Sequence, residues 1–70
     1  AQSLYNICSR TNSPLPGDLV FFTGTYDTPG VSHVGIYVGD GWMLHCGDPI
    51  GYANLNTSYW QSHFYAYGRL

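Results

Sequence analysis

Residues 32–45 read Ser-His-Val-Gly-Ile-Tyr-Val-Gly-Asp-Gly-Trp-Met-Leu-His, and this stretch decides the fold. Two runs typical of β-strands flank a Gly-Asp-Gly turn signal, which predicts a β-hairpin. Each predicted strand carries one histidine, His33 before the turn and His45 after it. A hairpin can hold two imidazoles rigidly at one place, as a general base and its orienting partner require.

The side chains of this hairpin indicate its register. A two-residue loop would place the two histidines on opposite faces and mix polar with apolar residues on both. A three-residue loop at residues 39–41 instead pairs Val38 with Trp42 and Gly35 with His45. One face of the hairpin is then entirely apolar, with Val34, Ile36, Val38, Trp42, Leu44 and Cys46. We therefore predict the three-residue register, with the apolar face turned to the core.

The opposite face carries the candidate site. His33 and His45 become diagonal neighbours there, with backbones about 7–8 Å apart. Gly35, opposite His45, leaves space above the sheet, and a glycine inside a strand often marks a close approach to the backbone. Tyr37 shares this face and is a candidate to hydrogen-bond a substrate, or simply packs against Met43. The alternative is that both histidines decorate a solvated sheet face.

Composition excludes several function classes. The chain has 70 residues, two arginines, no lysine and a net charge of −2. It is one small domain, which buries only about 60% of the surface that its unfolded chain exposes. The lack of basic patches argues against nucleic acid and anionic membranes as partners. No apolar run approaches the roughly 20 residues of a membrane span, and no signal peptide is recognisable.

The remaining segments predict an α+β fold, mainly an antiparallel β-sheet with short helices. Residues 1–8 have helical character, residues 19–23 form a buried strand, and residues 64–70 form a terminal strand. A short helix is expected near residues 56–61, between the hairpin and the last strand. The first residues look like a helix entered midway, so we expect an amino-terminal part to be missing.

Other chemistry-bearing residues give weaker signals. Cys46 is adjacent to His45 and should therefore point to the opposite face, into the core. Cys8 is a poor nucleophile candidate, because Pro14 leaves little helix behind it. Asp48 is explained by turn formation, yet it follows the second histidine closely and is a candidate to line its pocket.

A metal centre is a further alternative. It would use His33, His45, His63 and a cysteine, but no ligand spacing supports it. His63 is better explained as a surface or helix-end residue. We therefore expect neither a metal nor another cofactor.

Four motifs together resemble a known family. They are Leu-Pro-Gly-Asp-Leu-Val-Phe-Phe at 15–22, Ser-His-Val-Gly-Ile-Tyr-Val-Gly at 32–39, Met-Leu-His at 43–45 and Tyr-Gly-Arg at 67–69. Their order and spacing are similar to the carboxy-terminal half of NlpC/P60 cell-wall peptidases, over nearly the whole chain. The segments 45–52 and 58–61 most resemble the endopeptidase domain of bifunctional cell-wall hydrolases carried by conjugative transposons.

The resemblance implies a papain-like fold, in which a helix carries a nucleophilic cysteine against an antiparallel sheet. It implies that His33 activates this cysteine and that His45 orients the His33 imidazole. It also implies a bacterial protein that is secreted or cell-wall associated and acts on peptidoglycan stem peptides, between D-glutamate and the following diamino acid.

This chain departs from the family pattern at the nucleophile. The family's cysteine belongs to an Asp-Cys-Ser-like motif well upstream of the Pro-Gly-Asp turn, whereas Cys8-Ser9 lies too close to Pro14 and Pro16. Residues 1–70 are thus expected to form the carboxy-terminal part of one domain, to be inactive alone and to self-associate through exposed apolar surface. The alternatives are a non-catalytic wall-binding module and an inactive truncated remnant.

Overall fold

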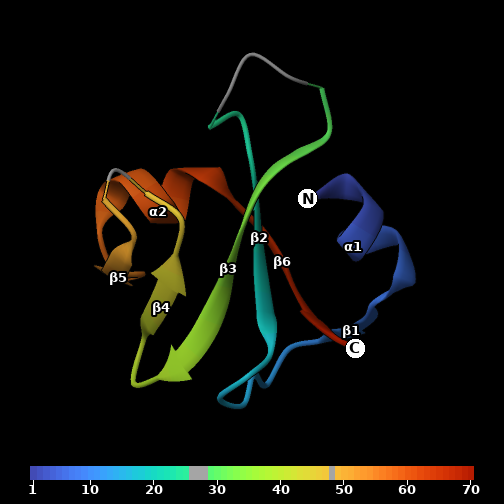
Figure 1. Ribbon diagram of the computed structural model, residues 1–70, viewed down its shortest axis with the longest axis horizontal. Helices are drawn as coiled ribbons and strands as arrows, with labels where there is room; N and C mark the ends of the chain where they lie inside the picture. Colours follow the sequence, from blue (N-terminus) through green and yellow to red (C-terminus); the bar gives the residue numbers. More distant parts are fainter. Residues whose placement is uncertain (26–28, 48) are drawn as a thin grey trace.

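The computed structural model describes residues 1–25, 29–47 and 49–70 (Figure 1). Six antiparallel strands and two short helices form an α+β fold, which confirms the predicted fold class. The elements are α1 (Gln2–Ile7), β1 (Ser9–Thr11), β2 (Leu19–Thr23), β3 (Val31–Gly39), β4 (Trp42–His45), β5 (Gly51–Asn54), α2 (Ser58–His63) and β6 (Phe64–Arg69). In Figure 1 the two helices lie on opposite sides of the central strands β2 and β3.

Strand β2 forms the centre of the molecule. The strand order is β1-β6-β2-β3-β4-β5, so β2 pairs with the hairpin on one side and with the last strand on the other. Val20, Phe21 and Phe22 are completely buried, and Leu19 is 8% exposed. A continuous apolar run is what a strand covered on both faces requires, and the prediction of a buried strand here is confirmed.

The two outer strands, β1 and β5, were not predicted. Both come from short segments next to turns, where residues 12–17 and 47–51 carry three of the four prolines of the chain. Each strand is stabilised by one neighbour, β6 for β1 and β4 for β5. Pairing of this kind is a tertiary contact that local β-propensity does not reveal.

The predicted three-residue loop of the hairpin is wrong, although most of the predicted register is confirmed. Gly35 pairs with His45, Ile36 with Leu44 and Tyr37 with Met43, as predicted, but Trp42 pairs with Gly39 and not with Val38. Asp40 and Gly41 form a two-residue turn with φ of 54° and 80°, the positive values of a type I′ turn. A bulge between Tyr37 and Gly39 restores the predicted register further along the strands.

The burial of the two hairpin faces is the reverse of the prediction. Met43 lies on the face that carries His33 and His45, here called the histidine face, and is completely buried. Ile36 and Trp42, on the apolar face, are 44% and 43% exposed. The reason is that Leu55 and Trp60 pack over the histidine face and close a core there. The second core, around Phe21, lies beneath Tyr5 of α1 and leaves much of the apolar face uncovered.

Candidate active site

His33 and His45 meet on the histidine face of the hairpin. His33 lies on β3 and His45 on β4, offset diagonally because Gly35 is the residue opposite His45. The Nε2 atom of His33 and the Nδ1 atom of His45 are 3.0 Å apart, and the two ring planes are perpendicular at 89°. The approach of the two rings that the register predicted is therefore confirmed.

Both imidazoles are biased toward their neutral forms. Burial lowers the pKa of His33, and the neighbouring His45 and the amino-terminal charge lower it further. Burial also lowers the pKa of His45. A hydrogen bond between two neutral imidazoles needs one ring to donate and the other to accept, so the pair fixes complementary tautomers. Near neutral pH the lowered pKa values favour a pair of uncharged imidazoles joined by a hydrogen bond.

The close approach to the backbone that was predicted at Gly35 is confirmed, but Met43 makes it. A Cβ atom at this position would lie 2.5 Å from the sulfur of Met43 and 3.4 Å from the Cβ of His45. The space above Gly35 is thus filled by the Met43 side chain, and Met43 packs directly onto the backbone. A larger residue at position 35 would force the buried Met43 side chain to shift.

A small pocket of about 200 Å³ opens around the histidine pair. Besides the two histidines, it is lined by Thr25, Cys46, Gly47, Tyr59 and Trp60. Gly47 lies against the His45 ring, since a Cβ there would be 3.0 Å from Cε1. Sequence reasoning placed Trp60 in a short helix but did not connect it with the site. One feature of the sequence could have indicated this position of Trp60. The helix that carries it directly precedes the last strand, which lies beside β2, so an aromatic side chain on this helix is expected to pack near the sheet.

Cys46 is exposed, and its predicted burial in the core is wrong. The chain leaves the sheet after His45, so the alternation of strand faces no longer determines where the next side chain points. Cys46 lines the histidine pocket and an adjoining apolar groove.

Cys8 lies elsewhere. It packs beside Gly68 and Phe21 on the α1 side of the sheet, and burial raises the pKa of its thiol. Gly68 pairs with Leu19 at one end of β2, whereas His33 pairs with Phe22 near the other end. Cys8 is thus near the opposite end of β2 from the histidine pair, and its thiol is protonated. It does not form a Cys-His dyad with the pair.

The other predicted site residues have separate positions. The Tyr37 hydroxyl accepts a hydrogen bond from the Gly41 N–H at 3.2 Å, and the ring packs against Tyr67. Tyr37 does not line the histidine pocket as far as the described residues define it. Asp48 lies outside the described residues, and a substrate contact for either residue stays a prediction. His63 ends α2, and its Nδ1 lies 2.8 Å from the Thr23 carbonyl oxygen.

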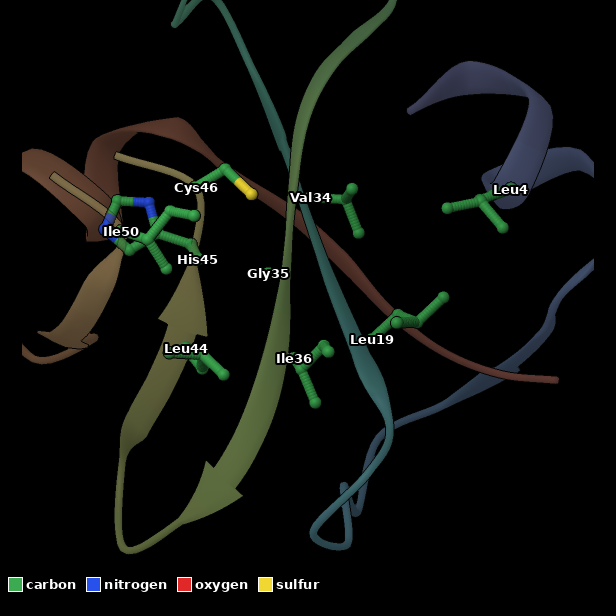
Figure 2. A pocket seen from close by; sticks show the side chains of 9 residues that line it. All are labelled: Leu4, Leu19, Val34, Gly35, Ile36, Leu44, His45, Cys46 and Ile50. Atoms are coloured by element: carbon green, nitrogen blue, oxygen red, sulfur yellow. The ribbon is translucent and has the colours of Figure 1, made fainter. Parts of the chain in front are cut away.

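An apolar groove of about 300 Å³ lies on the other side of the hairpin (Figure 2). Leu4 of α1 borders it on one side, and Cys46 and Ile50 border it on the other. Its floor is formed by Leu19, Val34, Gly35, Ile36, Leu44 and His45. His45 and Cys46 line both the groove and the histidine pocket, so both spaces lie beside the end of β4.

Two further properties concern the described part of the chain. Among those residues, no group of three histidine, cysteine or acidic side chains is placed to hold a metal ion. Neither α1 nor α2, the helices of the described residues, has the length and apolar character needed to cross a membrane.

Residues 2–69 match the NlpC/P60 family, and the chain belongs to it. The structure of an NLP/P60-family protein from Staphylococcus aureus, described as similar to lipoprotein, superimposes with a TM-score of 0.94 at 39% identity, covering 99% of this chain and 24% of that one. An NlpC/P60 protein from Bacillus cereus gives 0.70 at 27% identity, covering 90% of this chain and 22% of that one.

Curated relatives show the same similarity. The chain is 49% identical over 55 residues to the bifunctional muramidase/DL-endopeptidase CwlT of Bacillus subtilis, covering 77% of this chain and 17% of the relative. It is 47% identical over 53 residues to the probable peptidoglycan endopeptidase LytE of the same organism, covering 74% and 15%. The probable endopeptidase p60 of Listeria monocytogenes is 46% identical over 56 residues, covering 79% and 11%. The chain thus spans less than a fifth of the length of these relatives.

Proposed function

We propose that this chain supplies the base and the orienting residue of a cysteine endopeptidase that cleaves peptidoglycan stem peptides. The observation that carries the proposal is the 3.0 Å approach of His33 Nε2 to His45 Nδ1 in a chain of the NlpC/P60 family. Names of similar proteins, a DL-endopeptidase and a peptidoglycan endopeptidase, support the substrate class. We propose the bond between D-glutamate and the following diamino acid as the one cleaved.

The proposed mechanism divides the work between the two rings. His33 takes the proton of a cysteine thiol, and the resulting thiolate attacks the carbonyl carbon of the scissile peptide bond. His33 then returns this proton to the leaving amine, as a general base that becomes a general acid. In this scheme Nε2 of His33 carries hydrogen and donates to Nδ1 of His45, so His45 fixes the tautomer of the base.

The nucleophile is proposed to come from outside these 70 residues. Cys8 is distant from the histidine pair and has a raised pKa, which supports this part of the proposal. The apolar groove beside His45 is a suitable surface for a helix that carries such a cysteine, because its floor is almost entirely aliphatic. The chain would then be the carboxy-terminal part of one peptidase domain and inactive alone.

Purified peptidoglycan provides the direct test. The 70-residue chain should release no muropeptides. The coding sequence upstream of Ala1 should contain an in-frame Asp-Cys-Ser motif followed by a helix. In the polypeptide that includes this segment, His33→Ala should lower cleavage by about 10²–10⁴-fold, the usual contribution of a general base. Cleavage by the 70 residues that is abolished in Cys8→Ala would overturn the assignment of the nucleophile.

The setting of this activity is also a proposal. The similarity to a bifunctional muramidase/DL-endopeptidase supports an origin in a bifunctional cell-wall hydrolase. The bacterial relatives named as peptidoglycan endopeptidases support a secreted or cell-wall-associated location.

A wall-binding module is the second candidate function. Exposed aromatic rings favour it, since Tyr52, Tyr59 and Tyr65 are 69%, 51% and 47% exposed and aromatic rings offer flat binding surfaces. This candidate predicts that the chain cosediments with purified walls and that His33→Ala binds equally well. A chain that neither binds nor contributes to cleavage would be an inactive remnant.

A further inference from the structure

We propose that Trp60 is a positioning residue for the histidine pair, holding both imidazoles at the mutual angle that their hydrogen bond needs. The assignment rests on the proposed function for its catalytic meaning, but its geometric content is independent of any activity. Trp60 comes from α2, whereas the two histidines come from the hairpin. A third element of the fold, α2, therefore contacts the histidine pair.

The geometry of three rings carries this proposal. The Trp60 ring is stacked on His33, with centroids 5.8 Å apart and planes inclined by 20°. The same ring meets His45 edge to face, with centroids 5.1 Å apart and planes at 81°. Since the two imidazoles are perpendicular to each other, one planar ring can be parallel to the first only if it is perpendicular to the second. Trp60 satisfies both conditions, so rotation of either imidazole disturbs its packing on the indole.

Trp60 is itself held firmly. Its ring packs on the completely buried Phe22, with centroids 4.7 Å apart, and on Tyr59 at 4.9 Å. The next residue, Gln61, donates a side-chain hydrogen bond to the Leu55 carbonyl at 2.8 Å, which ties α2 to the core. Because packing fixes the position of Trp60, this residue restricts the orientation of the two imidazoles that it contacts.

A matched pair of variants separates ring geometry from simple filling of space. Trp60→Phe and Trp60→Leu both lose volume, but only phenylalanine keeps a planar ring to stack on His33. The readout is the ¹⁵N chemical shifts of both imidazoles in the labelled chain at pH 7.5, which report the tautomer of each ring. Trp42→Leu is the control, because Trp42 lies at the far end of β4 from His45 and is 43% exposed.

The wild-type chain and Trp60→Phe should each show one fixed tautomer per histidine, whereas Trp60→Leu should show averaged shifts. Trp42→Leu should resemble the wild type. The proposal is overturned if Trp60→Leu, with the backbone amide dispersion of a folded sheet, keeps fixed tautomers. It is also overturned if both Trp60 variants lose them equally while remaining folded, because the ring plane would then have no special role.

Cleavage measurements link this inference to the proposed function without depending on it. In a polypeptide that cleaves peptidoglycan, Trp60→Leu should lower kcat by about 10²-fold with little change in KM, as misplacement of a catalytic group does. Trp60→Phe should recover most of this loss. If no form of the protein cleaves peptidoglycan, the proposed function fails, but the imidazole spectra still decide the positioning role.

Discussion

Arg69 donates two hydrogen bonds to the carboxylate of Asp18, one from Nε at 2.9 Å and one from Nη2 at 2.7 Å. The two residues are 51 positions apart, and their contact joins the turn before β2 to the end of β6. Asp18 also accepts a hydrogen bond from the Leu15 N–H, so it closes its own turn as well. Asp18 therefore closes its own turn and also fixes the last strand.

This contact predicts a stability change in acid. Arg69, and next the Leu15 N–H, lower the pKa of Asp18 below its usual 3.8. The stabilisation is present above pH 3.8 and is lost as the pH falls through the lower pKa of the folded state. Urea unfolding midpoints of the wild type should thus fall between pH 5 and pH 2.5, and those of Asp18→Asn should be lower at pH 5 and change less. Asp40→Asn, at an exposed turn position, is the matched control.

The histidine pair predicts a second pH window, nearer neutrality. Because burial lowers both histidine pKa values, the unfolded chain binds more protons than the folded chain below about pH 6.5. Stability is fully present above this pH and is lost as the pH falls through the folded-state pKa values. The unfolding midpoint should therefore be lower at pH 5.5 than at pH 7.5. His45→Asn, which removes one titrating ring, should show a weaker dependence, and equal midpoints in the wild type would contradict the prediction.

The hairpin turn predicts how much the free energy of unfolding falls when a methyl group is added at Gly41. Gly41 has a φ of 80°, where a side chain is strained, and Gly41→Ala should destabilise the fold by about 1–2 kcal/mol. A Cβ at Gly51, by contrast, would meet nothing within 4 Å. Gly51→Ala should thus change the free energy of unfolding by no more than about 0.5 kcal/mol. Urea titration of both variants checks the comparison, which fails if the two changes are equal.

The exposed apolar groove predicts self-association of the isolated chain. Ile36 and Ile50 are 44% and 69% exposed there, on a face that a folded monomer leaves in water. Sedimentation velocity over a concentration series should show a reversible dimer or larger species, weakened by Ile36→Ser. Leu70→Ser is the control, because Leu70 is 78% exposed but does not line the groove. A single monomeric boundary for the wild type at all concentrations would contradict this prediction.

Local patterns were sufficient for several features of the fold and the site. Residues 19–23 predicted a buried strand, and the side-chain alternation of residues 32–45 predicted the pairing of Gly35 with His45. That pairing alone brings His33 and His45 together, because side chains alternate strictly along paired strands. The order and spacing of the motifs also indicated the NlpC/P60 family, which the match over residues 2–69 confirms.

Tertiary packing decided the rest. Which face of the hairpin is buried depends on where Leu55 and Trp60 return to the sheet, and the pattern within the hairpin does not contain this information. Cys46 is exposed because the strand ends at His45, and Trp60 joins the histidines because α2 packs beside β2, where Trp60 contacts Phe22. The sequence by itself determined the pairing of residues 35–37 with residues 43–45, which follows from the local alternation of side chains, but not the two-residue turn that joins the two strands. Only the tertiary structure decided burial and the surroundings of the site, because these depend on contacts between segments far apart in the chain.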